Sequence, residues 1–153
     1  MANQSSPATP SRVTFEHATP ILRVASFDAS LAYYVDALGF ELAWRDGGFG
    51  CVRRGDATLM LSEGSQGGAG TWVFLGVSDA DALHEELLAR GATIRHPPTN
   101  YPWGSRELHV FDQDGLVLRL GSDTRSGEPL GEWLDEDGTR WLPLDGGGWT
   151  RVE

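Results

Sequence analysis

The chain has 153 residues, a length that fits one domain or two small modules that share a core. Its apolar fraction of 40% is enough for a packed interior, but no apolar run approaches the roughly 20 residues that a membrane-spanning helix needs. The formal net charge is −10 and all 12 basic residues are arginines. Lysine chemistry such as Schiff-base formation is therefore excluded, and nucleic acid is disfavoured as a partner.

Residues 1–18 are polar and rich in proline and serine, and we expect a leader that is flexible up to about residue 11. This segment lacks the apolar stretch of a secretory signal, so a cytoplasmic location is expected. The single cysteine, Cys51, excludes an internal disulfide. The acidic charge either keeps the protein in solution, which is the favoured interpretation, or attracts cationic small molecules.

The order strand, turn, helix, glycine, strand occurs twice. It covers residues 21–42, where Gly39 follows the helix, and residues 73–94, where Gly91 does the same. A period near 50 residues indicates two like units, each too small to bury its own apolar face. The units must therefore pack against each other or pair across a dimer.

The first unit, residues 19–63, is expected to be a βαβββ module. Asp28 is a candidate N-cap for a helix that begins near Ala29. Apolar residues with helical spacing follow at positions 31, 34, 35 and 38. Strands are predicted at residues 21–24, 40–45, 49–53 and 58–61. Residues 64–70 contain four glycines and are expected to form the linker to the second unit.

The second unit, residues 71–122, follows the same βαβββ plan, so the fold class is α+β. Asp79 or Asp81 is expected to cap its helix, with Leu83, Leu87 and Leu88 as the buried stripe. Strands are predicted at residues 72–77, 92–95, 107–111 and 116–120, with an irregular proline-containing loop at 97–104.

Residues 123–153 lie outside the repeat and are predicted to form a C-terminal β-meander. They contain three of the six tryptophans. The favoured interpretation is a flap that covers an apolar edge or patch. A lid or a dimer arm is the alternative.

Two stretches resemble a known family. Residues 20–24 and 31–40 are similar to the opening of the vicinal oxygen chelate superfamily. Residues 103–115 are similar to its second-module signature, a WG-x-RE strand followed by a DPDG turn, with Gln113 in place of the usual proline. The superfamily contains glyoxalase I, extradiol dioxygenases, fosfomycin-resistance enzymes and bleomycin-resistance proteins. The resemblance covers about residues 19–122 and implies a curved mixed sheet that forms a cup.

The resemblance also implies where a metal would bind, because metal-dependent members point four ligands into the cup. The corresponding positions here hold Thr19, Met60, Trp72 and Arg119. These side chains do not suit a divalent cation, and the fixed charge of Arg119 would repel one. We therefore predict no metal and no other cofactor. A site of His17, Glu107 and His109 is the less favoured alternative, because these residues lack metal-ligand spacing.

Three polar residues are expected to meet inside the cup. Alternation along a strand puts Glu107 and His109 on one face. Antiparallel pairing across the turn at residues 112–115 then brings Arg119 near His109, with Glu107 diagonal to it. The trio either anchors a ligand or is a charge pair that replaces a lost metal site, and the sequence favours neither.

Aromatic side chains supply the rest of the candidate site. Tyr101 and Trp103 belong to the predicted loop beside the cup's mouth, and such a lining suits a flat organic ligand. The leading hypothesis is a metal-free protein like those of the bleomycin-resistance branch, which sequesters an aromatic or cationic small molecule in a homodimer. The expected ligand-binding residues are Phe49, Met60, Trp72, Tyr101, Trp103, Glu107, His109 and Arg119.

Two alternatives stay open at this stage. One is an enzyme of the superfamily (a lyase, isomerase or dioxygenase) with a displaced metal or with His109 and Glu107 as an acid–base pair. The other is an accessory module whose C-terminal meander docks another protein. No membrane partner is expected.

Overall fold

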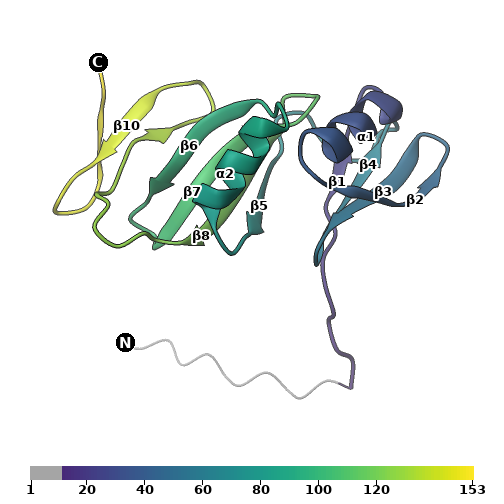
Figure 1. The fold of residues 1–153 in the computed structure, drawn as a ribbon, viewed down its shortest axis with the longest axis horizontal. Helices are drawn as coiled ribbons and strands as arrows, with labels where there is room; N and C mark the ends of the chain where they lie inside the picture. Colours follow the sequence, from purple (N-terminus) through teal and green to yellow (C-terminus); the bar gives the residue numbers. More distant parts are fainter. Residues whose placement is uncertain (1–11) are drawn as a thin grey trace, which may run out of the picture.

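The structure, a computed structural model, describes residues 12–153, so the first 11 residues of the predicted leader lie outside the described part. Two βαβββ modules stand side by side, and a small three-stranded sheet follows them (Figure 1). The first module contains β1 (Ile21–Arg23), α1 (Phe27–Asp36), β2 (Glu41–Asp46), β3 (Phe49–Arg54) and β4 (Ala57–Ser62). The second contains β5 (Trp72–Gly76), α2 (Ala80–Ala89), β6 (Ile94–Asn100), β7 (Ser105–Phe111) and β8 (Val117–Asp123).

The two modules have equivalent topology. The strand order is β1-β4-β3-β2 in one sheet and β5-β8-β7-β6 in the other. In each sheet the first strand pairs in parallel with the last, and the other neighbours are antiparallel. The predicted repeat and the α+β class are confirmed, with each module supplying a mixed sheet of its own.

Both helices begin at a side-chain cap. The Ser26 hydroxyl accepts a hydrogen bond from the Ala29 amide at 3.2 Å, so the predicted cap at Asp28 was wrong. Asp28 lies instead in the first turn, where a carboxylate is favourable near the positive end of the helix. It also forms an ion pair with Arg45 at 2.7 Å. In α2, Asp79 caps the Ala82 amide at 3.0 Å, one of the two predicted alternatives.

The predicted loop at residues 97–104 was wrong over its first half, because β6 continues through Pro97 and Pro98 to Asn100. Proline cannot donate to a ladder and is therefore restricted to edge strands and bulges. Here β6 is an edge strand, and its pairing with β7 has two register shifts before Thr99. The strand thus accommodates both prolines.

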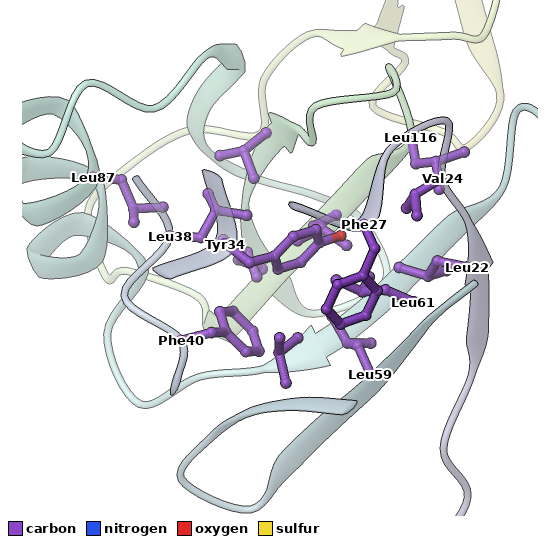
Figure 2. Close-up of a cluster of buried hydrophobic side chains, with 14 of the residues drawn as sticks. Leu22, Val24, Phe27, Tyr34, Leu38, Phe40, Leu59, Leu61, Leu87 and Leu116 are labelled. Carbon is purple, nitrogen blue, oxygen red and sulfur yellow. The ribbon is translucent and has the colours of Figure 1, made fainter. Parts of the chain in front are cut away.

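One apolar core joins the modules. Tyr34, Leu38 and Phe40 of the first module pack in the same cluster as Leu87 of α2 (Figure 2). Leu88 was predicted to belong to the buried stripe of α2, but this residue is 54% exposed. It lies on the side of the helix that faces away from the core. The two units therefore pack against each other within the chain.

A buried hydrogen bond crosses the boundary between the modules. The Tyr34 hydroxyl donates to Asp112 Oδ2 at 3.0 Å, and both residues are buried. Replacing Tyr34 with phenylalanine should lower the free energy of unfolding by about 1–2 kcal/mol, because the carboxylate oxygen loses its donor. Urea denaturation of both proteins measures the change. An unaltered midpoint would show that this bond does not stabilise the pair of modules.

Residues 123–153 form the predicted meander, with β9 (Trp133–Leu134), β10 (Arg140–Pro143) and β11 (Trp149–Arg151). It lies beside β6 at the end of the molecule far from the first module (Figure 1). The Gly131 amide donates to the Asn100 carbonyl at 3.0 Å, and Arg95 donates to the carbonyls of Leu134 and Asp135. The meander thus lies against the edge strand of the second sheet, and its role as a flap over that edge stays a prediction. Neither helix of residues 12–153 is long and apolar enough to cross a membrane.

Candidate ligand-binding site

Glu107, at the middle of β7, is the centre of the polar cluster. Pairing of β7 with β8 places His109 opposite Arg119, as the sequence predicted, and Glu107 opposite Gly121, diagonal to Arg119. Arg119 Nε donates to Glu107 Oε1 at 2.7 Å, and Nη2 donates to Oε2 at 2.9 Å. Trp103 Nε1 also donates to Oε2, at 2.5 Å. The carboxylate is fully buried. Its negative charge is balanced inside the protein by the bidentate ion pair with Arg119.

Burial and hydrogen bonding act in opposite directions on Glu107. Burial alone would raise the pKa of its carboxyl, but hydrogen bonds from His109, Arg119 and Trp103 outweigh it and hold the pKa at about 2. The group therefore stabilises the fold above about pH 4.5, its ordinary value, and this contribution is lost as the pH falls towards 2.

His109 is a neutral imidazole in this cluster. Burial lowers its pKa despite the nearby carboxylate of Glu107. Its Nε2 lies 3.1 Å from Glu107 Oε1, so we assign the proton to Nε2, which donates to the carboxylate. Nδ1 is then a bare acceptor, and it is buried without a hydrogen-bond partner. Since both side chains are fully enclosed, neither is arranged to exchange a proton with a ligand.

Acidification should destabilise the protein below about pH 6.5. Burial lowers the pKa of both His96 and His109 from that ordinary value, so the unfolded chain binds protons more readily. We expect His109→Gln to weaken the pH dependence of the unfolding free energy as the pH falls below about 6.5. Equal pH profiles for wild type and His109→Gln would contradict this assignment.

Aromatic rings stack above the polar cluster. Tyr101 lies between Trp103, at a centroid distance of 4.7 Å, and His109, at 6.0 Å. It is buried, so it supports Trp103 from below, whereas Trp103 itself is 48% exposed. Trp72 contacts the edge of His109 at 5.9 Å. Six of the eight predicted ligand-binding residues are thus brought together.

Trp133 from β9 completes this cluster, although the sequence did not identify it as a site residue. Its ring lies 5.4 Å from Tyr101 and from Trp103, and 5.2 Å from His109. The Arg119 guanidinium carbon lies 5.2 Å from the Trp133 ring centroid, within cation–π distance. The C-terminal meander is therefore part of the candidate site as well as an edge cover.

An open pocket of about 590 Å³ lies beside these rings, within the range of small-molecule sites. Its lining residues are Trp103, Arg119, Trp133, Asp135, Trp141 and Trp149. Four of the six are contributed by the meander. The concentration of tryptophan in residues 123–153 was the signal that could have identified them.

Phe49 and Met60 lie in the other sheet. Met60, on β4, pairs with Ile21 and Cys51, and Phe49, on β3, contacts the ring of Trp44 at 5.4 Å. Neither lines the tryptophan pocket. Their predicted role in ligand binding would need a second protein copy or a larger ligand.

The residues at the centre of the candidate site do not fit a metal ion. Within residues 12–153, no group of three or more His, Cys, Asp or Glu side chains could hold one. Glu107 already accepts bonds from three side chains, and the Arg119 charge lies directly beside it. The resemblance to metal-dependent enzymes thus does not extend to their donor set.

A larger hollow, of about 720 Å³, lies at the junction of the modules. Arg54 and Glu86 line it, but they are paired with each other through two bonds of 2.7 and 2.8 Å. Its apolar lining includes Leu38, Phe40 and Leu87, which belong to the core. The tryptophan pocket is the better candidate site because its rings are open to a ligand and adjoin the buried polar cluster.

The fold agrees with the comparison with known families. Residues 14–120 match the family described as the Glyoxalase/Bleomycin resistance protein/Dioxygenase superfamily. The chain belongs to this superfamily. The matched segment ends before the meander, so Trp133, Asp135, Trp141 and Trp149 lie beyond it.

Individual relatives point to the bleomycin-resistance branch. The chain is 29% identical over 117 residues to a bleomycin resistance protein of Klebsiella pneumoniae, covering 69% of this chain and 90% of that protein. It is similar to the bleomycin-binding protein of Streptomyces verticillus, solved with copper(II)-bleomycin (31% identity, TM-score 0.62, 73% and 99% of the two chains). The transposon Tn5 bleomycin resistance determinant is similar too (26% identity, TM-score 0.61, 72% and 100%).

Proposed function

We propose that the protein is a metal-free binding protein of the cytoplasm that sequesters an aromatic or cationic small molecule, as in antibiotic resistance. The observation that carries this proposal is the tryptophan-lined pocket above a fully paired Glu107–Arg119 bridge. Exposed indole rings provide large contact areas for a flat ligand. The polar groups beneath them, Glu107 and Arg119, already bond to each other, so the pocket is suited to binding a ligand without reacting with it.

Binding fits the geometry better than turnover does. An acid–base pair must reach the proton that it transfers, and its pKa should lie near the working pH. Glu107 and His109 are both enclosed, and the pKa of Glu107 is about 2. The relatives named above bind bleomycin or confer resistance to it, according to their names, which supports a ligand of that chemical class.

The proposal includes a homodimer. On β2, an edge strand, Leu42 and Trp44 are 43% and 42% exposed. Exposed apolar side chains on an open edge favour pairing with another surface. We expect sedimentation velocity to give twice the chain mass, and Trp44→Arg to give the monomer. A monomeric wild type at micromolar concentration would overturn this part of the proposal.

Calorimetry tests the sequestering function. Chelator-treated protein is titrated with metal-free bleomycin and with copper(II)-bleomycin, and mass spectrometry then shows whether the recovered ligand is unchanged. We expect binding, intact ligand, and at least a tenfold loss of affinity in Trp103→Ala. Leu144→Ala is the control, because Leu144 is equally exposed (49%) but lies outside the pocket. A chemically altered ligand would favour the enzyme alternative, and absence of binding would exclude a bleomycin-type ligand.

A further inference from the structure

The C-terminal meander gives the pocket the features of a cation-binding cage. Trp103, Trp133, Trp141 and Trp149 line it, and the three from the meander are half-buried, so each keeps exposed surface. Trp103 meets Trp133 at 5.4 Å with an interplanar angle of 80°, and Trp149 at 6.1 Å with 43°. The rings therefore line the pocket in several orientations. The negative π-face of indole attracts cations: Arg119 already lies 5.6 Å from the Trp103 ring and 5.2 Å from the Trp133 ring, and an organic cation can approach the ring surface that stays exposed.

One carboxylate lines the same pocket. Asp135 Oδ2 accepts from Trp141 Nε1 at 2.8 Å, and Oδ1 accepts from the Thr139 amide at 2.9 Å. These bonds fix its position at the wall of the pocket, while each oxygen keeps a further acceptor site. Asp135 thus places a fixed negative charge in the aromatic wall of the pocket.

The arginine at the pocket floor does not cancel this charge. Two of the three guanidinium nitrogens of Arg119, Nε and Nη2, donate to the two oxygens of Glu107, so that pair is neutral as a unit. Arg119 and Asp135 line the pocket and Glu107 lies buried beneath it, so the three groups together carry a net charge of −1. Residues 123–153 as a whole carry eight acidic residues against three arginines, which favours the approach of cations.

We propose that this cage, formed by the meander's tryptophans and Asp135, binds an alkylated ammonium group of the ligand. The inference deepens the proposed function, on which it rests, because it names the group that the sequestered molecule must carry. An alkylated ammonium suits the cage because its methyl groups contact indole faces while its charge is attracted by the rings and by Asp135. The family match ends at residue 120, so Trp133, Asp135, Trp141 and Trp149 lie outside the matched segment.

Choline and 3,3-dimethylbutan-1-ol test the proposal, because the second compound has the same shape with carbon in place of the charged nitrogen. Binding is followed through the tryptophan indole N–H resonances. We expect choline to bind at least tenfold more tightly than the alcohol. Asp135→Asn should weaken choline binding five- to tenfold and leave the alcohol unchanged. Asp145→Asn removes the same charge from an exposed turn of the meander, outside the pocket, and should affect neither.

Three results would overturn the inference: equal binding of the two compounds, no binding of choline, or an equal loss of choline binding in Asp145→Asn and Asp135→Asn. If Asp135→Asn loses indole signal dispersion, Trp149→Leu replaces it, and unchanged choline affinity in that variant would also overturn the inference. Bleomycin titrated in parallel separates the two proposals. Bleomycin binding without choline selectivity removes the cage alone, whereas failure of both ligands removes the proposed function too.

Discussion

Replacing Arg119 with methionine is expected to lower the free energy of unfolding by about 3–5 kcal/mol. The substitution keeps most of the side-chain volume but removes both donors to the carboxylate of Glu107, which has no exposed surface. An unpaired charge in a buried site is costly, and breaking such a pair typically has an effect of this size. Urea denaturation at pH 7 gives the measurement.

The double variant Glu107→Gln, Arg119→Met is the control for this explanation. It removes the buried charge together with its partner, so it should be clearly more stable than Arg119→Met alone. Strictly additive losses in the double-mutant cycle would contradict the view that Glu107 and Arg119 are coupled as one neutral unit.

Replacing Trp133 with alanine should have the second large effect. Its ring contacts Tyr101, Trp103 and His109, so the substitution removes the main packing between the meander and the second sheet. We expect the unfolding free energy to fall by about 3 kcal/mol, at the low end for a tryptophan because the ring is half-buried. Ligand affinity should fall more than tenfold, and limited proteolysis should cleave residues 123–153 first.

Trp149→Ala is the matched variant at the outer wall of the pocket. Trp149 packs against Trp103 at 6.1 Å and lies in the last strand of the meander. The Trp149→Ala variant should bind the ligand more weakly, but its unfolding free energy should fall by less than about 1 kcal/mol. Substitutions near the surface usually have small effects on stability. If Trp133→Ala were as mild as Trp149→Ala, the meander would not be anchored through Trp133.

Local patterns in the sequence were enough to predict the two modules and the polar cluster. The positions of Gly39 and Gly91 marked the ends of equivalent helices, and the turn at residues 112–115 set the pairing of His109 with Arg119. Strand alternation and a tight turn determine which side chains meet, so this part of the candidate site needed no knowledge of distant contacts.

The docking of the meander could not be predicted in the same way. Its contact with the second sheet depends on Trp133 meeting rings more than 20 residues away, and on Arg95 reaching the carbonyls of β9. Such contacts are set by tertiary packing, which leaves no periodic signal. The loop predicted at residues 97–104 was partly wrong for a related reason. Prolines are tolerated in β6 because it is an edge strand, and which strand lies at the edge depends on the whole sheet.

The most direct test of the account is an indole ¹⁵N–¹H spectrum of the chelator-treated protein, recorded during titration with metal-free bleomycin. The six tryptophans give six side-chain N–H signals, which single substitutions assign. We predict saturable shifts at Trp103, Trp133, Trp141 and Trp149, the four that line the pocket, without added metal. Binding that leaves these four signals unmoved, or that requires a divalent ion, would contradict the account.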